Sequence, residues 1–233
     1  MQDKTPDFKA VVFDMDGVLI DSEKEVEAFW IKWGNKYGKK LNFKEIHGKP
    51  LEGTLATTFA EIPEKDKDQI RQDCYDLETA MTYRPLKGSS KLVQELKKMG
   101  VSLALVTSAM PYKTDKALSD LDISEAFNVI VTADMIKKGK PDPSCYLLAA
   151  EKLGLSPIEC LGFEDSLAGL KAISTAGMYA IGVNEKASPA EIKAAGARDI
   201  IPGLNAVFPK MNSHSVELKI NDLKYVINLN SHK

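Results

Sequence analysis

The sequence predicts an α/β fold, a doubly wound parallel sheet with a helical domain inserted after its first strand. Three observations lead to this prediction. The apolar run Ala10–Phe13 ends abruptly at a carboxylate, as a short buried strand of a parallel sheet does. The next block, to about Met81, has helical periodicity and no convincing strand. From Gly88 onward, strands and helices alternate regularly, which is typical of parallel sheets with right-handed crossovers.

The block between the first strand and Gly88 contains three predicted helices. The first carries an apolar face made of Val26, Phe29, Trp30, Trp33 and Tyr37. The second covers 51–60 and follows the loop 47–50, and the third carries an apolar face made of Ile70, Cys74, Leu77 and Met81. These three helices predict a small bundle that lies outside the sheet.

The remaining elements follow in order, each with its own start or stop signal. We expect strands at 102–106, 128–131, 159–163 and 178–183. The helices between them include one that ends at Gly100, one that Pro111 opens and one that Ser166 caps. The tail alternates apolar and polar residues over 216–220 and 225–229, which predicts a hairpin added at a sheet edge or at the surface.

Composition narrows the class of protein. The 233 residues carry a net charge of −2, so no basic surface suggests binding to nucleic acid. No apolar run is long enough to cross a membrane, and the N-terminus has no apolar signal core. The three cysteines are scattered without metal-site spacing. We therefore expect a cytoplasmic protein, and nothing in the residues demands more than a monomer.

Polar residues that suit chemistry follow or adjoin the predicted strands. They are Asp14 and Asp16, Thr107 and Ser108, Lys140, and Glu164 and Asp165. In open α/β sheets ligands bind outside the carboxyl ends of the strands, so these groups are expected at one edge. Two carboxylates so close together favour a hard divalent cation such as Mg²⁺.

Each of these groups also has a simple structural interpretation. Asp14 and Asp16 could form an acidic turn, and Thr107 could cap a turn. Lys140 could be a solvated loop lysine, and Glu164 with Asp165 could serve the positive end of the next helix. The coincidence of all four clusters with strand ends favours the functional interpretation.

The sequence resembles the haloacid dehalogenase superfamily over nearly its whole length. Four segments carry the resemblance in the family's order: Phe-Asp-Met-Asp-Gly-Val at 13–18, Val-Thr-Ser at 106–108, Gly-Lys-Pro-Asp-Pro at 139–143 and Gly-Phe-Glu-Asp-Ser at 162–166. The helical block is similar to the cap of the β-phosphoglucomutase-like subgroup. The resemblance implies a Rossmann-like core of residues 1–21 and 86–233, and a cap of residues 22–85.

A closer resemblance rests on shorter segments. Residues 28–30, 47–49 and 131–148 look like bacterial sugar-phosphate phosphatases and like yeast-type glycerol-3-phosphate and 2-deoxyglucose-6-phosphate phosphatases. This similarity implies hydrolysis of a small phosphate monoester of a sugar or polyol.

The resemblance also implies roles for individual residues. Asp14 would be the nucleophile that forms an aspartyl-phosphate, and Asp16 the general acid and base. Thr107, Ser108 and Lys140 would bind phosphate oxygens. Mg²⁺ would be held by Asp14, the Asp16 carbonyl and Asp165, with Glu164 binding it directly or through water. In the cap loop, His47, Gly48 and Lys49 would contact the leaving group, although His47 could instead be a capping or packing residue.

Other functions on the same motifs remain open at this stage. Asp16 argues against a dehalogenase, because a halide leaves without a proton. A β-phosphoglucomutase shares the motifs and the cap, but Val26 stands where mutases of this group carry a cap-hinge histidine. A non-catalytic binding protein on the same fold is a further alternative. The sequence does not identify the physiological ester.

Overall fold

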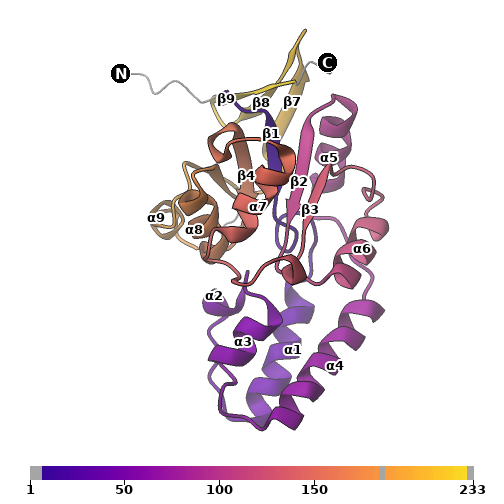
Figure 1. Cartoon of the computed structure of the whole chain (residues 1–233), viewed down its shortest axis with the longest axis vertical. Helices are drawn as coiled ribbons and strands as arrows, with labels where there is room; N and C mark the ends of the chain where they lie inside the picture. Colours follow the sequence, from indigo (N-terminus) through magenta and orange to yellow (C-terminus); the bar gives the residue numbers. More distant parts are fainter. Residues whose placement is uncertain (1–6, 184–186, 230–233) are drawn as a thin grey trace.

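The computed structural model describes residues 7–183 and 187–229. Its centre is a parallel sheet of six strands in the order β3-β2-β1-β4-β5-β6 (Figure 1). The strands are β1 (Ala10–Phe13), β2 (Ser102–Val106), β3 (Val129–Val131), β4 (Cys160–Glu164), β5 (Tyr179–Val183) and β6 (Asp199–Ile201). The predicted doubly wound α/β fold is therefore confirmed.

The two faces of this sheet bury different residues of the same strands. Val11 and Phe13 face one apolar cluster with α5 (Ser89–Lys98) and α6 (Pro111–Asp120). Ala10 and Val12 face the other cluster. That cluster includes α7 (Ser144–Leu153), α8 (Leu167–Ala176) and α9 (Pro189–Ala194). Because strand side chains alternate between faces, a run that is apolar at every position is what a sheet covered on both sides requires.

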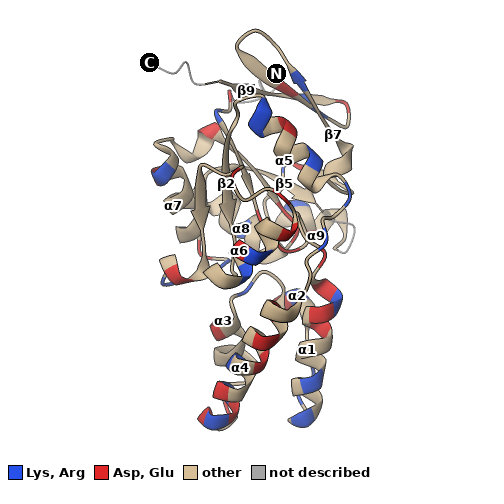
Figure 2. Ribbon diagram, turned by 90° about the vertical axis from the view of Figure 1, so that its right-hand side faces the viewer, with Lys and Arg blue, Asp and Glu red and all other residues tan. Residues whose placement is uncertain are grey.

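Four helices between β1 and α5 form a helical insert at one end of the molecule (Figure 1). They are α1 (Glu23–Lys36), α2 (Phe43–Ile46), α3 (Leu51–Thr57) and α4 (Glu64–Ala80). The insert has its own apolar core, which includes Trp30, Trp33 and Phe59. The ribbon in Figure 2 is coloured for acidic and basic residues at many positions along α1 and α4, as expected for helices with one face in solvent.

The tail is more elaborate than the predicted hairpin. Strands β8 (Ser215–Ile220) and β9 (Leu223–Asn228) pair antiparallel as predicted, and β7 (Val207–Met211) adds a third strand. The buried residues Val216, Leu218 and Tyr225 join the apolar cluster that contains α5. The tail sheet therefore covers part of the core at the end of the molecule opposite the helical insert (Figure 1).

Several short elements are absent from the sequence-based prediction. They are α2, α9, β6 and β7, each of six residues or fewer. The predicted second helix also ends at Thr57 rather than Ala60. Segments this short contain less than two helical turns or three alternations, so their periodicity is too weak to detect. None of the described helices has the length and apolar character needed to cross a membrane.

Candidate active site

The carboxyl ends of three adjacent strands bring the predicted polar clusters together. Strand β1 lies between β2 and β4, with Phe13 level with Leu105 and Phe163. Asp14 follows β1 directly and Glu164 is the last residue of β4. Lys140 comes from the loop before α7 and reaches both carboxylates. Topology, rather than proximity in the sequence, thus assembles the cluster.

Lys140 lies between two buried carboxylates. Its Nζ donates to Asp14 Oδ1 at 2.5 Å and to Glu164 Oε2 at 2.8 Å. Tyr146 also donates its hydroxyl to Glu164 Oε2 at 2.5 Å, and the Ser166 amide and hydroxyl donate to Oε1. Asp14 is 5 % exposed and Glu164 is fully buried. One lysine charge therefore faces two carboxylates in a region with little water.

The two carboxylates respond differently to this environment. Burial raises the pKa of Asp14 to about 7, with the negative charge of Glu164 adding to the rise and Lys140 opposing it. Burial alone would also raise the pKa of Glu164, but Lys140 and the Tyr146 hydroxyl outweigh it and hold that pKa below its usual range. Glu164 is thus the ionised partner of Lys140, and Asp14 is the group that a further positive charge would ionise.

The donor set around Asp14 fits a hard divalent cation. Asp14, Glu164 and Asp165 each offer an oxygen, and these atoms lie within 4.8 Å of one another. Gly17 has φ +77°, and a Cβ there would lie only 2.0 Å from Asp165 Oδ2. The loop after Asp16 thus approaches Asp165 as closely as a bare backbone allows. Each Glu164 oxygen already accepts two hydrogen bonds, so direct binding of a metal ion by Glu164 would have to displace a donor.

Asp16 is held at one oxygen by two donors. Lys113 Nζ lies 2.8 Å from Asp16 Oδ1, and the Ser22 hydroxyl donates to the same atom. Burial would raise the pKa of Asp16, but the Lys113 charge and these hydrogen bonds outweigh it and lower the pKa. Sequence reasoning missed Lys113, although one signal was present. A lysine in the first turn of a helix opposes the helix dipole, so it is unusual without a nearby anion.

The residues after β2 contact both core and helical insert. The Thr107 hydroxyl oxygen accepts from the Ala109 amide at 3.1 Å, so Thr107 stabilises the turn as its structural interpretation predicted. The Ser108 hydroxyl donates to the Gly48 carbonyl of the helical insert at 2.7 Å. Thr107 and Ser108 both line the same cavity as Asp14. The turn therefore joins the strand ends to the loop that faces them.

The predicted loop 47–49 reaches the site, and His47 of this loop contacts two glutamates of α1. His47 Nδ1 lies 3.5 Å from Glu23 Oε1, and its Nε2 lies 3.5 Å from Glu27 Oε1. Gly48 has φ +78° and approaches Ser166 so closely that a Cβ would lie 2.3 Å from its Oγ. His47, Gly48 and Lys49 all line the cavity. The contacts of His47 with α1 fit its packing interpretation as well as a functional one.

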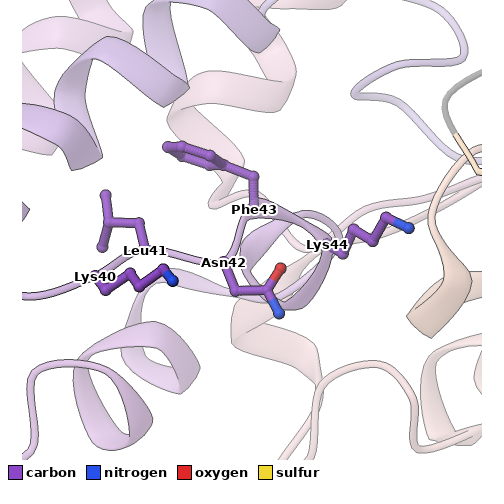
Figure 3. Close-up of a pocket in the computed structure, with 5 residues that line it drawn as sticks. All are labelled: Lys40, Leu41, Asn42, Phe43 and Lys44. Carbon is purple, nitrogen blue, oxygen red and sulfur yellow. The ribbon is translucent and has the colours of Figure 1, made fainter.

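A cavity of about 580 Å³ separates the strand ends from the helical insert. Its floor includes Asp14, Asp16 and Asp165, and its walls are largely apolar. The apolar lining includes Val26, Trp30, Leu51, Leu77, Met110 and Ile136. A second hollow runs along the segment 40–44 and contains none of the predicted site residues (Figure 3). In that view Lys44 points away from Lys40, and it pairs with Glu191 of α9 at 2.9 Å.

The chain is similar to known proteins over most of its length. A family model described as haloacid dehalogenase-like hydrolase matches residues 8–177. Hexitol phosphatase A of Escherichia coli is 36 % identical over 77 % of this chain and 84 % of its own length. β-Phosphoglucomutase of Bacillus subtilis is 31 % identical over 76 % and 84 %. A solved structure called putative β-phosphoglucomutase, from Bacteroides vulgatus, superposes with a TM-score of 0.75 and 26 % identity, covering 86 % of each chain.

Proposed function

The chain belongs to the haloacid dehalogenase-like hydrolase family, and from this premise we propose that it is a Mg²⁺-dependent phosphatase acting on sugar or polyol phosphates. The observation that carries the proposal is the position of Asp14. It directly follows the central strand β1, contacts Lys140, and has an oxygen within 4.8 Å of oxygens of Glu164 and Asp165. Two relatives of this chain are named hexitol phosphatase A and β-phosphoglucomutase, and these names support a phosphorylated carbohydrate as substrate.

The proposed first step transfers the phosphoryl group to Asp14. A carboxylate oxygen of Asp14 attacks phosphorus and forms a new P–O bond while the ester P–O bond breaks. Asp16 donates a proton to the departing alkoxide, which would otherwise be a poor leaving group. Lys140, the Thr107 hydroxyl and the Ser108 amide are proposed to bind the phosphoryl oxygens and orient the ester.

The second step returns the enzyme to its starting state. Asp16, now a carboxylate, takes a proton from water as that water attacks phosphorus of the aspartyl-phosphate. The bond to Asp14 breaks and inorganic phosphate leaves. The ion pair with Lys113 favours the ionised form of Asp16 that this step requires.

The metal site is proposed on Asp14, Asp165 and the Asp16 carbonyl. A bound Mg²⁺ would neutralise phosphate charge and favour the ionised form of Asp14. Glu164 is proposed to act behind these ligands by holding Lys140, because its oxygens are already engaged by Lys140, Tyr146 and Ser166.

The helical insert is proposed to act as a cap with hinges near residues 20–22 and 84–87. These two segments run side by side, since the Asp21 amide donates to the Arg84 carbonyl at 3.0 Å. Closing the cap would exclude bulk water from phosphoryl transfer, and opening it would admit the water for hydrolysis. His47, Gly48 and Lys49 are proposed to contact the leaving group from the cap side.

A phosphatase and a mutase share all of these parts, so the assay must separate them. Val26 lines the cavity from the first turn of α1. The cap-hinge histidine that mutases of this group carry is therefore replaced by an apolar side chain at this position. With β-glucose 1-phosphate and its 1,6-bisphosphate as primer, we expect release of inorganic phosphate. Efficient formation of glucose 6-phosphate would instead establish the mutase.

The central test is a screen of hexose, hexitol, triose and nucleoside monophosphates with Mg²⁺ and with EDTA. We expect phosphate release that depends on Mg²⁺ and ranks the carbohydrate esters highest by kcat/KM. Asp14→Asn should abolish turnover while the protein stays folded by circular dichroism. Acid-quenched wild type should carry a phosphoryl mass on the peptide that contains Asp14. Turnover retained in Asp14→Asn would refute the assigned nucleophile.

A further inference from the structure

Lys113 places a buried ammonium between carboxylates of the core and the helical insert. Only 5 % of the residue is exposed. Its Nζ lies 2.8 Å from Asp16 Oδ1 and 3.4 Å from Glu78 Oε1, near the C-terminal end of α4. Lysine is almost never buried without paired charges, so both contacts are needed to keep it there. The residue belongs to none of the four motifs that predicted the site.

The second carboxylate, Glu78, is itself held in place. It is 14 % exposed at its side chain, and the Tyr112 hydroxyl donates to its Oε2 at 2.8 Å. Tyr112 also stacks edge-on against Tyr75 of α4, with ring centroids 4.9 Å apart. Tyr112 and Lys113 of α6 thus both contact Glu78 near the end of α4, and Lys113 also contacts Asp16.

The contacts of Asp16 show what this arrangement achieves. Lys113 and Ser22 bind the same oxygen, Oδ1. Among the described residues no donor binds Oδ2, and Asp16 lines the cavity. Two donors on one oxygen fix the plane of the carboxyl group and leave the other oxygen for the substrate. Charge-assisted hydrogen bonds are strong enough to hold such an orientation.

We propose that Lys113 is a positioning residue that holds the carboxyl group of Asp16 in the orientation for proton exchange with the leaving group, with Glu78 anchoring Lys113 from the helical insert. This inference rests on the proposed function, because it presupposes the acid and base roles of Asp16. Misplacing a catalytic group by about 1 Å can lower a rate by about 10²-fold. Loss of Lys113 should therefore affect the proton transfer far more than the binding of the ester.

Single-turnover kinetics can isolate the proton transfer. An alkyl phosphate needs a proton on its leaving oxygen, whereas p-nitrophenolate departs without one. In Lys113→Met, which keeps an unbranched side chain as far as Cε and removes the ammonium, we expect about 10²-fold slower release of the alcohol. Release of p-nitrophenol from p-nitrophenyl phosphate should change by less than about threefold. A loss of similar size for both esters would refute the positioning role, because a general structural defect would produce it.

Matched variants separate charge and position from folding. Lys116→Met, one turn along the same helix, removes a partly exposed lysine paired with Asp120 and should behave as wild type. Lys113→Arg should restore most of the alkyl-phosphate rate. Glu78→Gln should lose less than Lys113→Met, with the same selectivity for the alkyl ester. If Lys113→Met does not fold, Lys113→Gln and Glu78→Gln carry the same comparison, and equal losses for both esters would again overturn the proposal.

A double-mutant cycle with Asp16→Asn tests whether Lys113 acts through Asp16. If it does, Lys113→Met should change the alkyl-phosphate rate by less than about twofold in the Asp16→Asn background. Additive losses would contradict this inference and leave the proposed function intact. Undiminished alkyl-phosphate turnover in Asp16→Asn alone would instead contradict the proposed function.

Discussion

Replacing Asp14 with asparagine should stabilise the metal-free protein, and more so at high pH. The Asp14 carboxyl is 5 % exposed, and burial with the Glu164 charge raises its pKa from 3.8 to about 7. A carboxyl whose pKa is raised on folding contributes stability at pH values below 3.8. That contribution is lost as the pH rises from 3.8 to about 7, because over this range the unfolded chain releases the proton and the folded protein keeps it.

The size of the effect follows from the two pKa values. Compared with a carboxyl whose pKa stays at 3.8, Asp14 lowers the free energy of unfolding by about 4 kcal/mol at pH 8, where the folded protein carries it ionised. At pH 5, where the folded protein keeps it protonated, it lowers the free energy of unfolding by about 2 kcal/mol, at about 1.4 kcal/mol per pKa unit. Asparagine carries no charge at either pH. The free energy of unfolding of Asp14→Asn relative to wild type should therefore increase by about 2–3 kcal/mol from pH 5 to pH 8. The asparagine carbonyl can still accept the hydrogen bond from Lys140.

Urea unfolding in EDTA at pH 5 and pH 8 measures this difference. Asp115→Asn, an exposed carboxylate on α6, is the matched control and should show no such increase. Added Mg²⁺ should stabilise wild type and have little effect on Asp14→Asn, since a ligand stabilises the state that binds it. The reasoning is wrong if the variant gains no stability over wild type between pH 5 and pH 8.

Three further substitutions test single contacts of the site. Tyr146→Phe leaves a lone pair of buried Glu164 without its donor, and denaturant unfolding should show a loss of about 1–3 kcal/mol; an unchanged midpoint would contradict the contact. Gly17→Ala forces the loop away from Asp165, so titration of activity with Mg²⁺ should show about 10-fold weaker activation. Gly100→Ala is the matched control, because Gly100 has the same φ as Gly17 but has open space where the Cβ would lie. If Gly100→Ala weakened Mg²⁺ activation as much as Gly17→Ala, the argument would be refuted. Ser108→Ala removes the hydrogen bond to the Gly48 carbonyl, and steady-state kinetics should show KM rising about fivefold with kcat nearly unchanged; equal losses in both would contradict a role in holding the loop.

The sequence predicted the parts of the site that depend on single strands. Asp14 follows the apolar run Ala10–Phe13, and Glu164 ends another such run, so each could be placed at a strand end. Parallel topology then requires these ends to meet at one edge. Lys140 was grouped with these residues as part of a loop, and the resemblance to a known family then implied a role for it in binding phosphate. The strand ends meet at one edge as expected, because this expectation needs only strand direction and sheet order.

The tertiary structure alone decided which side chains touch. Lys113 lies 97 residues from Asp16, and it meets Glu78 only because α6 packs against the end of α4. Tyr146 belongs to none of the four motifs, yet its hydroxyl donates to Glu164. Such contacts depend on the angle and register with which helices cross a sheet or each other. Those quantities are fixed by packing across the whole core, and no local pattern of residues encodes them.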